Sequence, residues 1–419
     1  MPKVANFNLS GGINRRASPF LVRPQEVELA RNVTMEQIGA ISKRRGYGLP
    51  ITVQSGKEVL GLHEFTISSS GTTYLYAIAN NSGDTAATLK YATDPLSTFT
   101  AHGDANTQTL LAGAKYEFAN FIDVCFIVGS TSSAFQQIFT TAGILSGDYS
   151  ATQYVSGAPN ARYIIQAFDR ILLCNTSDNQ SQVFWSDLPG GSTGSWTLTW
   201  TSTNNLNIQT QDGDIIKGVG ANFNRYLVFK QNSIHKIDPF TLDDVPDVVR
   251  EKGNIGTTSH RSIKNVGQST IFYRAGNGFY DYRNDEPELI SRRIDDFVAA
   301  IPSGRDVPAS ADERYYYAMA GTLIVGGRTF TNVMFEYDYL LTAWTVYDNF
   351  GGSVIARFGP TDRKNFHFGG ASDGTVYEMF SHTTTSTSTS STSSSTSSTS
   401  STSSSTSSTS TSSTSTTTT

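Results

Sequence analysis

The residues that most often carry chemistry are scattered along this chain. The histidines are widely dispersed, and none forms an HxH or HxxxH pair. A metal site on one strand or helix needs such a pair, so we expect none of that kind. Cys125 and Cys174 each lie in an apolar run, where a thiol packs as a small hydrophobic group. The histidines are His63, His102, His235, His260, His367 and His382.

Acidic residues give no convincing catalytic pattern. Adjacent pairs occur at Asp243–Asp244, Asp285–Glu286 and Asp295–Asp296, but glycoside hydrolysis needs two carboxylates that flank one bond, and neighbours in a strand point to opposite faces. Asp212 and Asp214 match a fragment of a calcium loop that lacks the other ligands. No GxSxG turn, phosphate-binding glycine loop or dinucleotide motif is present. We therefore expect no enzyme activity, with no catalytic residue, metal or cofactor.

Basic residues gather near the start of the chain. The segment 1–48 has eight Lys or Arg and three Glu, a net charge of +5, whereas the remainder carries −10. An acidic body argues against a general nucleic-acid-binding face, while a basic segment can contact an acidic partner or phosphates. We interpret these side chains as interface and solvation groups, with nucleic-acid contact by 43–45 as an alternative. The interface candidates are Arg15, Arg16, Lys43, Arg44 and Arg45.

Strand patterns dominate the elements that would position these side chains. Short runs of β-branched and aromatic residues alternate with Gly, Asn, Asp and Ser, and the chain holds 19 Tyr, 24 Phe and 36 Gly. One helix is predicted, over Pro24–Thr34, because Val27, Ala30 and Val33 recur at three-residue spacing behind a proline. No apolar stretch approaches the length of a membrane-spanning helix, so we expect no membrane anchor and synthesis in a cytoplasm.

The strands fall into groups that resemble one another, which is typical of a repeat fold. Most groups contain a strand, a short polar turn, an aromatic-rich second strand and a third strand. Blades of roughly 40–50 residues would divide the body, 49–382, into about seven. We therefore predict an all-β fold, a β-propeller of six or seven blades whose alternating aromatics pack between blades. The groups are Glu58–His102, Tyr116–Phe139, Arg162–Leu198, Ile215–Asp238, Ser262–Phe297, Arg314–Tyr347 and Val354–Phe380.

Three segments follow from these patterns. Residues 1–48 form an N-terminal arm, residues 49–382 the propeller body, and residues 383–419 a tail of Ser and Thr alone. Such a tail cannot offset its ordering entropy by apolar burial, so it is expected to be disordered as a free monomer. Tails held close together could pack as strands against neighbouring subunits, since Thr favours strands. A passive linker or glycan-bearing stalk is the alternative.

The arm resembles the opening of tail and neck structural proteins of double-stranded DNA bacteriophages. Those proteins begin with Gly-Gly-x-Asn, a proline-containing segment, a short helix with an Ala-x-Asn ending, a glycine, and Arg-x-Gly-Tyr entering the first blade. Two later segments, Ile271–Val298 and Phe335–Asp348, are similar to blades of the same proteins. The matching positions are Gly11, Gly12, Asn14, Pro24, Ala30, Asn32, Gly39, Arg45, Gly46 and Tyr47.

The resemblance implies a nozzle-like virion protein of a short-tailed phage. Such a protein forms a hexameric ring that attaches to the portal and adaptor and to other tail proteins, and conducts genomic DNA through its lumen without sequence specificity. An acidic lumen would repel DNA phosphates and let the DNA slide, which suits the −10 body. The body is smaller than that of the larger nozzle proteins, which leaves the position of the ring open.

A second interpretation is a recognition module. A propeller can bind host-surface carbohydrate or protein, or tail fibres, through its loops, and aromatic rings serve as platforms for sugars. Trp196 and Trp200, in the run SWTLTW, are the candidate platforms. An enzyme that trims surface polysaccharide is a third and more distant interpretation.

Overall fold

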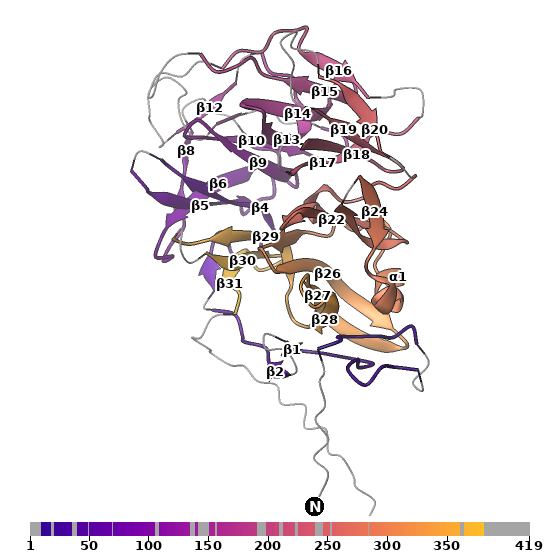
Figure 1. The fold of residues 1–419 in the computed structure, drawn as a ribbon. Helices are drawn as coiled ribbons and strands as arrows, with labels where there is room; N and C mark the ends of the chain where they lie inside the picture. Colours follow the sequence, from indigo (N-terminus) through magenta and orange to yellow (C-terminus); the bar gives the residue numbers. More distant parts are fainter. Residues whose placement is uncertain are drawn as a thin grey trace, which may run out of the picture. The chain divides into compact units, whose positions relative to one another are not determined.

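The computed structural model describes most of the chain up to residue 380 (Figure 1). The chain divides into two units, Met1–Thr384 and Thr385–Thr419, and every described residue belongs to the first. The predicted Ser/Thr tail, residues 383–419, lies outside the described residues. Described are 10–17, 21–35, 40–48, 50–68, 70–104, 109–134, 139–140, 151–155, 157–190, 198–208, 213–222, 225–238, 246–251, 254–283, 285–360 and 364–380.

The described strands form seven sheets of four or five strands in chain order. Blade 1 contains β4 (Val59–Thr66), β5 (Thr73–Asn80), β6 (Ala87–Thr93) and β7 (Thr100–Ala101). Blade 2 contains β9 (Lys115–Phe121), β10 (Val124–Ser130), β11 (Phe139–Thr140), β12 (Ala151–Tyr154) and the parallel strand β8 (Gly103–Asp104). Blade 3 contains β13 (Ala161–Ala167), β14 (Arg170–Thr176), β15 (Gln182–Trp185) and β16 (Asn205–Asn207).

The remaining blades repeat this antiparallel order. Blade 4 contains β17 (Ile216–Asn222), β18 (Arg225–Lys230), β19 (Ile234–Ile237) and β20 (Val248–Arg250). Blade 5 contains β21 (Lys264–Val266), β22 (Ser269–Arg274), β23 (Gly278–Arg283) and β24 (Glu286–Leu289). Blade 6 contains β25 (Ala309–Ala311), β26 (Tyr315–Val325), β27 (Arg328–Asp338) and β28 (Ala343–Tyr347). Blade 7 contains β29 (Gly352–Phe358), β30 (Asn365–Gly370), β31 (Thr375–Glu378) and β3 (Ile51–Thr52).

The seven sheets are the blades of a β-propeller. Their first strands, from β4 to β29, all line one central cavity, so the sheets surround a common axis. Seven apolar clusters lie between successive blades, the last joining blade 7 to blade 1. The predicted all-β propeller is therefore confirmed, and each of the seven groups of strands found in the sequence contributes one blade.

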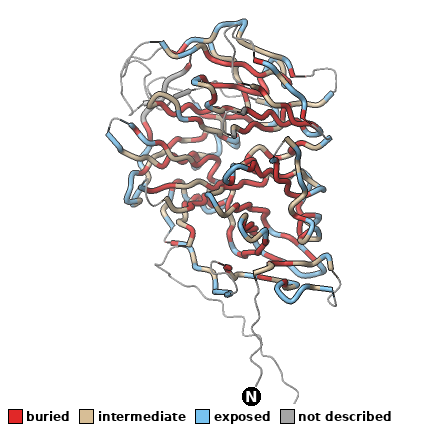
Figure 2. Tube along the Cα trace, in the orientation of Figure 1, coloured by how far each residue is buried: buried red, intermediate tan, exposed pale blue. Residues whose placement is uncertain are grey.

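Burial between blades explains the apolar runs. The second strands β10 and β14 are buried along their whole length, because neighbouring blades cover both of their faces. Figure 2 shows this burial concentrated in the strands of the blades, with exposed residues in the connecting turns. Runs covered on both faces lose the polar alternation of a strand with one solvent face. Cys125 and Cys174 lie within these strands as fully buried thiols.

The ring closes with a strand from the other end of the body. β3 precedes blade 1 in the chain but pairs antiparallel with β31 as the outermost strand of blade 7, with Ile51 opposite Val376. Two distant segments thus share one sheet, so blade 7 cannot separate from blade 1 without losing backbone hydrogen bonds. The arm adds a two-stranded sheet of β1 (Val33–Thr34) and β2 (Ser42–Lys43), whose position below β28 is visible in Figure 1.

The helix predicted for Pro24–Thr34 is wrong. This segment begins with a turn at Pro24 and Gln25 and then makes an isolated bridge from Val27 to Ile13 and another from Arg31 to Val346 of β28. Its backbone groups form hydrogen bonds with the arm and with blade 6. A helix with only three apolar positions would bury little apolar surface in exchange for these bonds. The α-helix found in the described residues, α1 (Asp295–Ala299), instead follows the 3₁₀ turn η3 (Arg292–Ile294) after blade 5.

Trp344 allows a test of the inter-blade core. Its side chain is fully buried between blades 5 and 6, and its Nε1 donates to the Ile290 carbonyl at 3.0 Å. We expect Trp344→Ala to lower the free energy of unfolding by about 3–5 kcal/mol, because it leaves a large cavity. Leu340→Ala, in the turn before β28 and 69% exposed, is the control and should change little. Urea denaturation measures both, and equal losses would contradict this packing.

Candidate functional site

The axis of the propeller contains two cavities. The ends of the innermost strands line one of about 440 Å³, which reaches from Glu64 to Ala356. The beginnings of the same strands line another of about 400 Å³, which includes Lys115 and Lys217. We call the cavity at the strand beginnings the first well and the other the second well. Both share Glu117, His260 and Arg261, so these three residues lie at the boundary between the wells.

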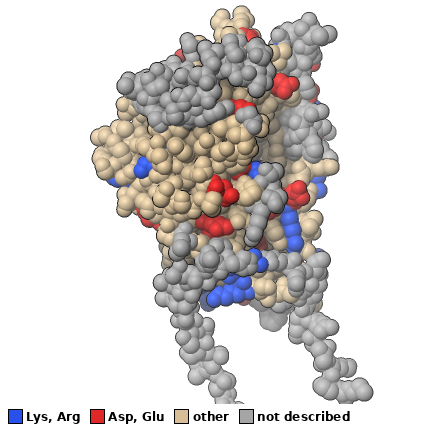
Figure 3. All heavy atoms as spheres, turned by 90° about the vertical axis from the view of Figure 1, so that its left-hand side faces the viewer, with Lys and Arg blue, Asp and Glu red and all other residues tan. Residues whose placement is uncertain are grey.

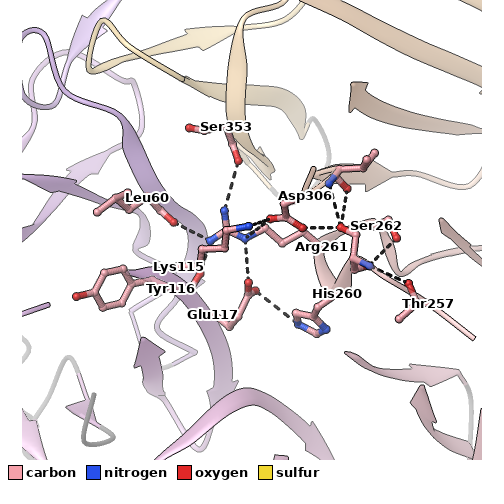
Figure 4. Close-up of polar contacts among 12 residues, drawn as sticks. Leu60, Lys115, Tyr116, Glu117, Thr257, His260, Arg261, Ser262, Asp306 and Ser353 are labelled. Carbon is pink, nitrogen blue, oxygen red and sulfur yellow. Dashed lines mark hydrogen bonds and ion pairs between the residues drawn. The ribbon is translucent and has the colours of Figure 1, made fainter. Parts of the chain in front are cut away.

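Arg261 joins several blades across this boundary (Figure 4). It lies in the 3₁₀ turn η2 (His260–Ser262), directly before blade 5, and its side chain is 10% exposed. Its Nη2 donates to the carbonyls of Leu60 at 2.7 Å and Tyr116 at 3.2 Å, and its Nη1 to that of Ser353 at 3.4 Å. Nε donates to Glu117 at 2.9 Å. One guanidinium at the start of blade 5 thus binds groups of blades 1, 2 and 7.

Two carboxylates balance this buried charge. Burial would raise the pKa of Glu117, but Arg261, and then His260, outweigh it and hold that pKa below its usual range. Burial would also raise the pKa of Asp306, but the positive charges of Arg261 and Lys115 outweigh this effect and lower that pKa. The Lys115 Nζ lies 3.0 Å from Asp306 Oδ2. Burial lowers the pKa of His260. We therefore treat both carboxylates as ionised and His260 as neutral at pH 7.

Removal of Arg261 should destabilise the fold, because two buried carboxylates lose their main positive partner. We expect Arg261→Met to lower the free energy of unfolding by about 3 kcal/mol or more, because loss of one partner leaves buried charge uncompensated. Because both acids have lowered pKa values in the fold, the stability they contribute is present above their unfolded pKa and lost as pH falls through the folded one. The variant should therefore lose part of the acid dependence of the melting temperature.

Lys57→Met is the matched control for Arg261→Met. It breaks a surface pair with Asp84, at 2.5 Å, whose carboxylate is largely in solvent. We expect little change in the melting temperature of this variant, since exposed pairs contribute little. If both variants melted alike at pH 7, loss of Arg261 would not leave the uncompensated buried charge that we describe.

The arm holds some of the predicted interface residues against its own propeller. Arg15 donates from Nε to Asp296 of α1 at 2.6 Å, and its guanidinium lies 5.4 Å from the centre of the Phe297 ring. Arg44 donates to the Asp348 carbonyl at 3.0 Å and lies 4.7 Å from the centre of the Phe350 ring. Burial lowers the pKa of Arg44. Both side chains attach the arm to blade 6 and its flanking segments.

The other three interface candidates face solvent. Arg16, Lys43 and Arg45 are exposed. Leu21, which is 74% exposed, and Ile41 add apolar surface to the same arm. On the face drawn in Figure 3, Lys and Arg side chains gather at the lower end, the end at which Figure 1 places β1 and β2. Contact of these five predicted residues with another subunit stays a prediction.

Asn32 and Arg31 fix the middle of the arm to the end of β28. Asn32 adopts a positive φ of 57°, and its Oδ1 accepts from the Asp348 backbone N–H at 3.0 Å and from Arg44 Nε at 2.8 Å. Arg31 forms an ion pair with the Asp348 carboxylate, which is 2% exposed. Asn tolerates a left-handed backbone better than most residues, which suits this position.

A buried carboxyl lies next to this attachment. Glu336 of β27 is 3% exposed and accepts hydrogen bonds from the hydroxyls of Tyr347 at 2.8 Å and Thr345 at 3.1 Å. Burial raises the pKa of Glu336 to about 7, although these hydrogen bonds act in the opposite direction. The Arg44 guanidinium lies 5.9 Å from the centre of the Tyr347 ring. The Glu336 carboxyl and the arm therefore meet at one tyrosine.

Titration of Glu336 should reduce stability as pH rises. Its folded pKa of about 7 lies above the ordinary 4.5, so the stability it contributes is full below about pH 4.5 and is lost as pH rises through about 7. We expect Glu336→Gln to become more stable relative to wild type by about 2 kcal/mol between about pH 5 and pH 8. The difference between the two urea-denaturation curves is the measurement, because His63 and His367 also titrate in the fold. A constant difference would contradict the assignment.

One of the two predicted sugar platforms, Trp200, lies in the described residues. Trp200 is half-buried in the core between blades 2 and 3, where its ring stacks on Phe184 with centres 6.2 Å apart. Trp196 lies outside the described residues. One face of the Trp200 ring is thus used for packing between blades.

The network around Arg261 was not predicted from the sequence. Glu117 lies in the strand run KYEFANF and Arg261 in the turn run SHRSIK, and neither run differs from other charged segments of the chain. Their meeting depends on the closure of the ring, which brings residues 60, 117, 261 and 353 to the axis. A charged residue at the entrance to an innermost strand is the only local signal.

The acidic pairs and histidines of the sequence can be placed in part. The described part of the chain contains no cluster of three or more His, Cys, Asp or Glu able to hold a metal ion. It also has no helix with the length and apolar character needed to cross a bilayer. The acidic pair Asp295–Asp296 begins α1, whereas Asp285 lies in a turn with a positive φ and Glu286 begins β24. Asp243–Asp244 and Asp212 lie outside the described residues.

Comparison with known proteins shows the fold. No known protein family matches the sequence, and no curated protein does. Among solved structures, the chain is similar to an ancestral GH74 enzyme, with a TM-score of 0.50 and 8% identity over 85% of this chain and 51% of that one. It is also similar to PorZ of Porphyromonas gingivalis, an essential surface component of the type-IX secretion system, with a TM-score of 0.47 and 11% identity over 80% of this chain and 38% of that one.

A third similar structure is a propeller domain by itself. The β-propeller domain of the Trilobed protease from Pyrococcus furiosus gives a TM-score of 0.42 and 8% identity, over 78% of this chain and 98% of that one. The chain spans about half or less of the length of the GH74 enzyme and PorZ. At these identities the likeness concerns architecture alone, and the β-propeller fold of this chain is shown by its own sheets and their common axis.

Proposed function

We propose that this chain is a structural protein of a phage virion, located in the tail or neck. Its subunits assemble into a ring, which we take to be a hexamer, that attaches to the portal or adaptor and conducts or gates the genomic DNA. The observation that carries this proposal is the attachment of the arm. Several residues on which the resemblance to phage tail proteins rests also fix the arm to blades 6 and 7.

Gly12 shows why the motif needs its particular residues. The Gly12 φ is +70°, and a Cβ there would lie 2.8 Å from the Ala343 Cβ and 2.9 Å from the Trp344 N. Any larger residue would push the arm away from β28, where the Ile13 N–H donates to the Trp344 carbonyl at 3.1 Å. A glycine is therefore required for this close backbone approach.

Tyr47 supports the other end of the arm. Its ring makes edge contacts with Phe350, Phe368 and Tyr377, with centres 5.1–5.9 Å apart. The adjacent Gly48 N–H donates to the Glu378 carbonyl at 2.7 Å. The arm is thus fastened at both ends, and its exposed basic and apolar side chains are held in fixed positions, as an assembly contact requires.

The path of the DNA in this proposal lies between subunits. Arg261 and its partners cross the axis of each propeller, so a single propeller offers no open conduit. The space enclosed by the ring is therefore the proposed lumen. No catalytic residue is needed for this function, and the protein would be made in the host cytoplasm and act in the virion.

Oligomeric state tests the proposal directly. We expect mass photometry and negative-stain microscopy of the full chain to show closed rings. Reversing the exposed charges with Lys43→Glu and Arg45→Glu should convert most rings into folded monomers, because these side chains contact the neighbour. Lys57→Glu, a charge reversal in the segment between β3 and β4, should leave the rings intact.

Two results would contradict the ring. A wild-type chain that stays monomeric, alone and with the portal and adaptor, would exclude it. A monomer that binds host cells would favour the recognition module, whose candidate Trp200 faces the core in this structure. Rings that persist in the charge-reversed variant would retain the proposed function but remove Lys43 and Arg45 from the interface.

A further inference from the structure

The first well is a polar cavity for which the proposed ring has no use. Its volume is about 400 Å³, within the range of sites for small molecules and far below that of a nucleic-acid duplex or a protein. Hydroxyl groups make up much of its wall. They belong to Ser130, Thr131, Ser132, Thr258 and Ser259.

The charge of the well is opposite to that of the chain. Four cationic residues line it and two acidic ones, a formal charge of +2 with His260 neutral, whereas the chain carries −5. Both acids already have partners, since Glu117 binds Arg261, and Asp306 binds Lys115 and the Ser259 hydroxyl at 2.5 Å. The cations are Lys115, Arg162, Lys217 and Arg261.

Lys217 provides the specific group. It lies in β17, is half-buried and lines the first well. Within the described part of the chain, its ammonium makes no hydrogen bond or ion pair. An ammonium that lines a cavity without a protein acceptor can donate its hydrogen bonds to an anion bound there.

Lys264 is the matching residue in the second well. It lies in β21, the innermost strand of the next blade, and also lines a well at the axis. Burial lowers its pKa, but the Glu117 carboxylate acts on it in the opposite direction. The second well also contains both Glu64 and Glu117, so its lining carries less net positive charge than that of the first well.

The backbone leaves room for a ligand in the first well. A Cβ placed on Gly113 or Gly304, both in its wall, would meet no atom within 4 Å. Lysine binds phosphate as a point charge, and serine and threonine hydroxyls can donate to its remaining oxygens. A compact tetrahedral dianion therefore fits these donors better than a planar carboxylate does. A carboxylate pairs best with the two parallel N–H groups of an arginine guanidinium.

We propose that the first well binds a small phosphate-bearing molecule, either inorganic phosphate or a phosphate monoester, with Lys217 as its principal charge partner. Lys115 and the hydroxyls of Ser130, Ser132 and Thr258 complete the site. Arg261 forms its floor through the network that separates the two wells. The ligand thus lies at the axis of each propeller and does not require the ring.

Calorimetric titration of the full chain in chloride buffer tests this site. The probes are inorganic phosphate, glycerol 3-phosphate and, as the neutral control, glycerol. We expect both phosphate probes to bind and glycerol to give no heat. Lys217→Met should weaken phosphate binding at least tenfold, whereas Lys264→Met should stay within twofold of wild type. Tighter binding of glycerol 3-phosphate than of inorganic phosphate would indicate a phosphate monoester as the natural ligand. Equal binding of the two probes would indicate inorganic phosphate.

A second variant protects the test against a folding defect. Gly304→Asp places a carboxylate where a Cβ has free space, and it should abolish phosphate binding by repulsion while the melting temperature without ligand stays near that of wild type. Phosphate should raise the melting temperature of wild type but not of this variant. Absence of binding by wild type at millimolar phosphate would overturn the proposal. Loss of binding in Lys264→Met but not in Lys217→Met would also overturn it.

Discussion

The burial of one guanidinium at the propeller axis constrains the rest of this structure. Arg261 requires acceptors, and they come from Leu60, Glu117 and Ser353, which belong to three other blades. A buried ion pair adds little net stability, because desolvation of its charges costs about as much as their attraction returns. Its effect is on specificity, since blades in any other relative position would leave the charge without partners. The apolar clusters between blades supply the stability. Arg261 finds its acceptors only when the blades have the relative positions in which these clusters pack.

The blades could be predicted from the sequence because their signals are local. A strand, a turn and an aromatic-rich strand follow one another directly in the chain, and each repeat of this order became one sheet. The helix over Pro24–Thr34 was predicted wrongly because three apolar positions are a weak helical signal, and the backbone partners of this segment lie far away in the chain. The non-helical form prevails because Arg31 bridges Val346 of blade 6, and no window of sequence contains both of these residues.

The axial site could not be predicted for the same reason. Its residues lie between positions 60 and 353, and only closure of the ring by β3 and β31 brings them together. Charge composition did point to the arm, and Arg15 and Arg44 do make ion-pair or cation–π contacts. However, composition cannot distinguish a basic side chain that holds its own arm from one that is available to a partner. That distinction depends on burial, which separates Arg44 from its exposed neighbours Lys43 and Arg45.

The two proposed interactions use separate parts of the molecule. Ring assembly depends on the outward side chains of the arm, which is fixed to β28 and β31 at the outer strands of blades 6 and 7. The phosphate site depends on the innermost strands, with Lys217 in β17 of blade 4. Sites more than about 10 Å apart with no shared partners contribute independently. A propeller separates its rim from its axis by the width of a blade, so a change at one site leaves the other intact, and each proposal can fail alone.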